Sequence, residues 1–218
     1  MSVRVLIVDD QELLRTAIAL TLERDPRIAA VVTVASGEAA IEHVRAHAVD
    51  VVLMDIRMPG MDGIAATREI LRVRPGIRVL ILTTFDLDEY VYAAIREGAS
   101  GFLTKDATPA ALADAAVAVA AGEAVMSPRA TTALMGFVRG GAPAADPERV
   151  LAQLSPRERE VARALATGAS NDDIARRLFL SANTVKTHVK AVLAKLGVPD
   201  RVHVVIWAYE NGLLRPRG

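Results

Sequence analysis

The 218-residue sequence contains no cysteine, which excludes a disulfide framework, a thiolate metal site and a cysteine nucleophile. It also has no apolar run near the length of about 18 residues that a membrane-spanning helix needs. The first ten residues hold a short apolar stretch that ends in acids, without the cleavage pattern of a signal peptide. We therefore expect a cytoplasmic protein that does not enter a membrane.

An excess of charge of either sign is also missing, because 26 basic residues balance 26 acidic ones. The balance hides a difference between the two parts of the chain. Residues 1–140 contain 14 Lys+Arg and 18 Asp+Glu, a net charge of −4, and residues 141–218 contain 12 and 8, a net charge of +4. The second part is the better candidate for contact with a polyanion.

Apolar residues are abundant, at 52%, and up to residue 122 short apolar runs alternate with stretches of helical periodicity. The runs lack polar alternation, which is typical of strands buried on both faces. Five such units predict an α/β doubly wound sheet of five parallel strands, with its ligand site at the carboxyl ends of the strands. Strands are predicted at 3–8, 30–35, 51–54, 79–82 and 101–103, and helices at 12–24, 38–46, 64–74, 88–97 and 110–121.

The last third of the chain predicts a small all-α domain. Ser155-Pro156-Arg157-Glu158 is a capping box with proline at the first helical position. Glycines follow the helical patterns that come after it. Helices are predicted at 156–167, 171–178, 182–196 and 202–211. We assign residues 1–122 to the first domain, 123–149 to a linker that is rich in Gly, Ala and Pro, and 150–218 to the second domain.

Acidic residues end two strands of the predicted sheet. Asp9 and Asp10 follow the first strand and Asp55 follows the third, and these strands are neighbours in a sheet of order 2-1-3-4-5. Three converging carboxylates repel one another, and Mg²⁺ suits a site of few carboxylates with waters and phosphate oxygens. The alternative is that acids at strand ends only cap the following helices, a reading that is about as good for Asp10 alone.

A hydroxyl and an ammonium group join the same edge. Thr83 or Thr84 ends the fourth strand, and Lys105 follows the fifth. A carboxylate nucleophile, a metal, a cation and a hydroxyl donor are what phosphoryl transfer requires. The complete set is harder to explain by helix capping than any single acid.

Residues 3–121 resemble the receiver domain of two-component response regulators, a flavodoxin-like fold. The resemblance implies that a partner histidine kinase phosphorylates Asp55. It also implies a Mg²⁺ site formed by Asp9, Asp10, Asp55 and the backbone carbonyl of Arg57.

The same resemblance assigns three further residues. Thr83 matches the switch hydroxyl and Lys105 the phosphate-binding lysine. Phe102 matches the aromatic switch position, although a plain core residue of the fifth strand is nearly as good an interpretation. The family often has a cis proline after the lysine, whereas Asp106 stands here, so the sequence leaves the isomer of the Lys105–Asp106 bond open.

The helices predicted at 171–178 and 182–196 have helix-turn-helix spacing. In the second of them, one stripe is apolar and another is basic and free of acids. A basic face of small residues fits the major groove of DNA, where lysine reaches guanine or phosphate. Two lysines are more often only a solvated surface, but no Asp or Glu occurs from Ser181 through Pro199. The expected DNA-contacting residues are Thr184, Lys186, Thr187, His188 and Lys190.

The stretch LSPREREVARALATGASNDDIARRLFLSANTVKTHVKAVLAKLG, residues 154–197, resembles the LuxR-type DNA-binding domain. Together with the receiver it resembles the NarL/FixJ class of response regulators. The resemblance implies a transcription factor, not an enzyme, in which phosphorylation controls homodimerisation and binding to paired half-sites on double-stranded DNA. Its expected partners are a sensor histidine kinase and the promoter, with RNA polymerase as a further candidate.

Two other functions share part of this pattern. A phosphatase with an aspartyl nucleophile usually has a second acid two residues after the nucleophile, where this chain has Arg57. A receiver that no longer uses phosphate and serves only for protein contacts is disfavoured by the complete set of acids, threonine and lysine.

Overall fold

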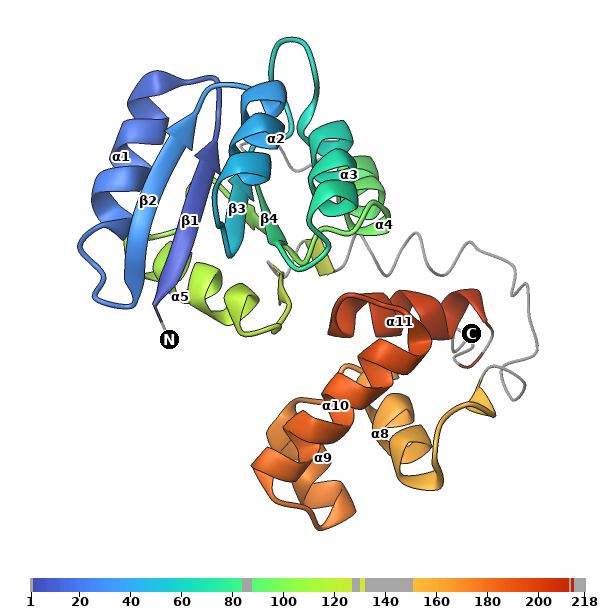
Figure 1. Cartoon of the computed structure of the whole chain (residues 1–218). Helices are drawn as coiled ribbons and strands as arrows, with labels where there is room; N and C mark the ends of the chain where they lie inside the picture. The colour runs from blue at the N-terminus through green and yellow to red at the C-terminus, as the bar shows by residue number, and fades with distance from the viewer. Residues whose placement is uncertain (1, 84–87, 127–129, 132–150, 212, 214–218) are drawn as a thin grey trace. The chain divides into compact units, whose positions relative to one another are not determined.

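The computed structural model describes residues 2–83, 88–126, 130–131, 151–211 and 213 (Figure 1). The chain divides into two compact units, Met1–Leu134 and Met135–Gly218. The division falls within the range 123–149, most of which lies outside the described residues, so the bounds of the linker stay a prediction.

The first unit is built on a parallel sheet in the order β2-β1-β3-β4-β5-β6. Its central strands are buried along nearly their whole length, as the apolar runs predict. In β1, alternate residues from Val3 to Ile7 pack with α1 and α5 in one core cluster. The strands are β1 (Val3–Val8), β2 (Ile28–Val34), β3 (Val51–Met54), β4 (Arg78–Thr83), β5 (Gly101–Thr104) and β6 (Val125–Met126).

Helices lie on both faces of this sheet, with α1 and α5 on one side and α2, α3 and α4 on the other (Figure 1). Side chains at the N-caps fix where three of them begin: Ser36, Asp62 and Thr108 each accept a hydrogen bond from a backbone N–H of the first turn. The helices are α1 (Glu12–Leu22), α2 (Gly37–Ala46), α3 (Gly63–Val73), α4 (Asp88–Arg96) and α5 (Pro109–Ala120).

The doubly wound α/β fold is confirmed, but the sheet has six strands and not five. The additional strand, β6, pairs with Gly101 and Phe102 at the edge of the sheet. A Cβ atom at Gly101 would lie 2.5 Å from the carbonyl oxygen of Val125, so the absence of a side chain there permits this pairing. Two residues carry no detectable periodicity, which is why the sequence pattern missed the strand.

The second unit contains α8 (Pro156–Ala166), α9 (Asn171–Leu178), α10 (Ala182–Leu196) and α11 (Arg201–Glu210). The predicted capping box is present: Ser155 and Glu158 each accept a hydrogen bond from the other's backbone N–H. Leu165, Ile174, Val185 and Val192 meet in its core. Helix α8 packs on α10 and α11, and α9 packs mainly on α10.

Among the described residues, no helix combines the length and the apolar character needed to cross a membrane.

Candidate functional site

The acidic residues at the ends of β1 and β3 meet, as predicted. The N–H of Asp55 donates to the carbonyl of Val8 over 2.9 Å, which continues the pairing of the two strands by one residue. Carboxylate oxygens of Asp9, Asp10 and Asp55 lie within 4.8 Å of one another. Asp9 and Asp55 are buried, whereas Asp10 is exposed. A group of three carboxylates of this kind is typical of a site for a hard divalent cation.

Lys105 enters this acidic group from β5. Its Nζ lies 2.6 Å from Oδ2 of Asp9 and 2.8 Å from Oδ2 of Asp55. All three side chains are at most 5% exposed. The N–H of Lys105 donates to the carbonyl of Thr83 over 2.8 Å, so the end of β4 fixes where the lysine leaves the sheet. The structure therefore brings together side chains that lie far apart in the sequence.

The charges in this group perturb one another. Burial raises the pKa of Asp55 above its ordinary value, although the hydrogen bond and the charge of Lys105 act in the opposite direction. Burial also lowers the pKa of Lys105, but the bonds to Asp55 and Asp9 outweigh burial and leave its pKa above the ordinary value. Lys105 is therefore a stable cation, and it compensates only part of the charge of three carboxylates.

The loop after Asp55 is held close to the carboxylate. Oδ1 of Asp55 accepts a hydrogen bond from the N–H of Ile56 over 2.8 Å, and the carbonyl of Ile56 accepts one from Gly63 over 2.9 Å. A Cβ atom at Gly63 would lie 1.9 Å from the carbonyl oxygen of Asp55. Only glycine permits the start of α3 to approach the phosphoacceptor candidate so closely.

The other predicted receiver residues lie on β4, on β5 and in the loop after β3. Thr83 is the last residue of β4 and is 2% exposed; Thr84, the alternative, lies outside the described residues. Phe102 is 1% exposed in β5, so in this conformation it is a core residue. The guanidinium of Arg57 lies over the ring of Tyr90 in α4, 5.7 Å from its centroid. No cis peptide bond occurs among the described residues, so the Lys105–Asp106 bond is trans.

One residue of this site was missed in the sequence. Arg15, on the second turn of α1, donates a hydrogen bond to the backbone carbonyl of Asp9. It thereby ties the helix to the turn that carries the acidic pair. The sequence does contain a signal for this contact, because a basic residue stands one turn into the helix that follows Asp9-Asp10.

In the second unit, α10 presents the predicted basic face. Val185 and Val192 are buried, whereas Lys186, Thr187 and Lys190 are exposed. Thr184 and His188 are half-buried, and the hydroxyl of Thr184 shares a hydrogen bond with that of Ser181, the N-cap residue, over 2.8 Å. Asn183 is also exposed, in the first turn of this helix.

Comparison with known protein families agrees with both units. Residues 5–117 match the response regulator receiver domain, and residues 152–208 match the bacterial regulatory proteins of the luxR family. The chain belongs to the NarL/FixJ family of response regulators. This is a family of DNA-binding transcription factors, not of enzymes, and Asp55 in the acidic group is the aspartate that is phosphorylated.

Individual family members align along almost the whole chain. The DNA-binding transcriptional activator DevR/DosR of Mycobacterium tuberculosis is 38% identical over 216 residues, which cover 99% of this chain and 98% of the relative. The nitrate/nitrite response regulator NarL of Escherichia coli is 35% identical over 207 residues, or 95% of each chain. The crystal structure of ChrA, a response regulator in a heme-sensing two-component system, is 37% identical with a TM-score of 0.53, over 98% of this chain and 99% of that one.

Proposed function

We propose that a partner histidine kinase phosphorylates Asp55, and that this event switches dimerisation and sequence-specific DNA binding by α10. The observation that carries the proposal is the ion-pair arrangement at the sheet edge, where Lys105 bridges Asp9 and Asp55. A lysine that already touches the nucleophile can move its hydrogen bond to an incoming phosphoryl oxygen without a large rearrangement. We also propose that the protein is cytoplasmic, where it can contact both the kinase and the promoter.

The chemistry assigned to Asp55 is one displacement at phosphorus. A carboxylate oxygen of Asp55 attacks the phosphorus of a phosphohistidine, the new O–P bond forms as the P–N bond breaks, and the imidazole leaves with the electron pair. Lys105 stabilises the charge on the transferred oxygens. Thr83, at the end of the neighbouring strand, is suited to donate its hydroxyl hydrogen to one of these oxygens.

The carboxylates fit a Mg²⁺ ion. Asp9, Asp10 and Asp55 offer hard oxygen ligands within 4.8 Å of one another, and Lys105 alone leaves two of their three negative charges uncompensated. These acids, with the backbone carbonyl of Arg57, would hold the ion. When bound, Mg²⁺ supplies positive charge that compensates the acids and the phosphoryl oxygens.

The burial of Thr83 and Phe102 is compatible with the switch that the family resemblance assigns to them. A hydroxyl drawn toward a phosphoryl group leaves space that a neighbouring side chain can fill, and a packed core responds with discrete rearrangements. Phe102 lies on the strand that pairs with β4, opposite Ile81. We infer that it changes position when Asp55 is phosphorylated, and that the altered surface controls dimerisation.

Binding of DNA is assigned to the exposed face of α10. Lys186, Thr187 and Lys190 provide two cations and a hydroxyl for phosphates and base edges, with Thr184 and His188 at the border of this face. A dimer would place two such helices on half-sites about one helical turn apart. RNA polymerase is a further candidate partner at the promoter.

The proposal is tested by incubating the full chain with Mg²⁺ and a small phosphodonor and measuring its intact mass. We expect one added phosphoryl group on the native protein and on Asp114→Asn, an exposed aspartate of α5, and none on Asp55→Asn. Binding to DNA selected from random sequence should then strengthen with phosphorylation in the native protein and in Asp114→Asn, but not in Asp55→Asn. The proposed switch is wrong if Asp55→Asn still gains a phosphoryl group, or if the native protein binds DNA equally well with and without phosphorylation.

A further inference from the structure

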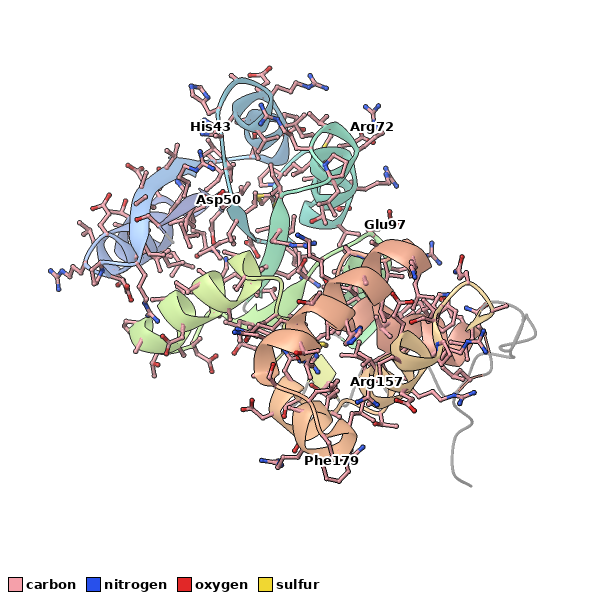
Figure 2. All side chains as sticks on the ribbon, turned by 60° about the horizontal axis from the view of Figure 1, so that its bottom comes forward. His43, Asp50, Arg72, Glu97, Arg157 and Phe179 are labelled. Carbon is pink, nitrogen blue, oxygen red and sulfur yellow. The ribbon has the colours of Figure 1, made fainter. Side chains whose placement is uncertain are left out.

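The turn between α9 and α10 displays an aromatic side chain to solvent. Phe179 is 95% exposed, more than any other large apolar residue described. It lies at the tip of the second unit (Figure 2). It packs in neither core cluster of the described residues. Folding of the unit gains little from a side chain in this position.

The backbone conformation of Phe179 is itself unfavourable for the folding free energy. Its φ of 55° and ψ of 48° are left-handed, a conformation that glycine adopts freely and bulky residues rarely adopt. The other described residues with positive φ are all glycines, and one of them, Gly197, ends the next helix. A glycine at position 179 would satisfy the turn at a lower cost in free energy.

The turn is nevertheless held firmly. The N–H of Phe179 and that of Leu180 both donate to the carbonyl of Ala175, and Arg157 donates to the carbonyl of Leu178 from α8. The ring is therefore presented from a fixed backbone. A residue that is strained, exposed and rigidly held is better explained by binding than by folding.

The position of the ring indicates what it binds. Phe179 lies two residues before Ser181, the N-cap of α10, and the N-terminal residues of a recognition helix are the ones that reach into the major groove. Arg176 and Arg177 precede it and are exposed; Arg176 pairs with Asp173, and the side chain of Arg177 is a cation that can meet a phosphate. Phenylalanine makes apolar contacts with the 5-methyl group of thymine.

We propose that Phe179 is a DNA-contacting residue that packs on the apolar surface of the duplex, a thymine methyl group or a deoxyribose, beside the groove entered by α10. This inference rests on the proposed DNA-binding function. An apolar contact has a distinct signature, because it releases no counterions and its contribution does not depend on salt.

The experiment uses the phosphorylated full chain and a duplex that it selects from random sequence. Phe179→Asn removes the ring with a residue that tolerates left-handed backbone, and Phe179→Gly removes both ring and strain. We expect both to bind the selected duplex about tenfold more weakly, by the same factor at low and high salt. Fluorescence of Trp207, the only tryptophan, should show that Phe179→Gly unfolds at no lower urea concentration than the native protein.

Thymines of the duplex are then replaced singly by deoxyuridine, which lacks the methyl group. If one replacement weakens binding by the native protein but not by Phe179→Asn, the ring contacts the methyl group of that thymine. If Phe179→Asn binds more weakly than the native protein but no single replacement has this effect, the ring contacts a deoxyribose. If both variants bind the duplex with native affinity, the inference is wrong. This holds even if the variants activate transcription less well, because Phe179 would then contact a protein and not DNA. If the native protein selects no DNA, the proposed function fails as well.

Discussion

The ammonium group of Lys105 lies between two buried carboxylates, 2.6 Å from Asp9 and 2.8 Å from Asp55. Lys105 follows β5, whereas Asp9 follows β1 and Asp55 follows β3. Without a metal ion, this cation is what offsets the repulsion between the two acids. Lys105 and a divalent cation thus compensate the same two carboxylates. The stability of the fold and the affinity for the metal should therefore be linked.

The first prediction concerns this link. Lys105→Met leaves two buried carboxylates without their cation, so we expect the free energy of unfolding to fall by about 3–5 kcal/mol in the presence of EDTA. Saturating Mg²⁺ should restore part of that loss. Calorimetry with and without Mg²⁺ measures both quantities.

Lys190→Met is the matched control, because this lysine is exposed on α10 and its loss should change stability by no more than about 0.5 kcal/mol. An equal loss for Lys105→Met in EDTA and in Mg²⁺ would show that the carboxylates do not form the metal site.

A second prediction concerns Gly63. Gly63→Ala forces a Cβ atom to within 1.9 Å of the Asp55 carbonyl, so the loop beside the phosphoacceptor must move. We expect a loss of about 3 kcal/mol in stability and slower phosphorylation by a small phosphodonor. Gly76→Ala is the control, since its Cβ would meet no atom within 4 Å; similar behaviour of the two variants would contradict the argument.

The site could be predicted in part because its residues end buried strands. Apolar runs show where β1 and β3 stop, and the order of a doubly wound sheet then brings Asp9 and Asp55 together. The bounds of α9 and α10 agree with the prediction for a similar reason, since Ser170, Ser181 and Gly197 cap these helices through local contacts.

Contacts between distant segments could not be predicted in the same way. The ion pair between Glu158 and Lys195 spans 37 residues and depends on how α8 packs on α10. The local pattern gave Glu158 only its capping role. Phe179 is a different case. A left-handed turn favours glycine, so a phenylalanine does not indicate such a turn in the sequence. The strain at this residue becomes visible only in the backbone geometry.

The ion pair of Glu158 yields a prediction on pH. The hydrogen bond from Lys195 and the backbone bond from Ser155 lower the pKa of Glu158 from 4.5 to about 2. A lowered pKa means that the stability from this carboxylate is present above pH 4.5 and is lost as the pH falls through about 2. Glu158→Gln should therefore be less stable than the native protein near neutral pH, with the difference shrinking through this range.

Urea unfolding followed by Trp207 fluorescence measures this effect in the second unit. Glu160→Gln is the control, on the same helix but 51% exposed in its pair with Arg157. A difference between the native protein and Glu158→Gln that does not change with pH would rule out a role for the ionised carboxylate.

The last prediction separates lysines that bind DNA from those that do not. Lys186 and Lys190 are exposed on α10, and if either neutralises a phosphate, its replacement by alanine should reduce the slope of log K against log salt by about 0.9. If it instead reads a guanine, the loss should be about 1–3 kcal/mol and depend on the base at one position of the site. Affinities over a salt series on the selected duplex and on single-base variants distinguish the two. Arg72→Ala, on α3 of the other unit, should alter neither quantity, and an effect as large as that of Lys190→Ala would mean that the basic face of α10 is not the DNA-binding surface.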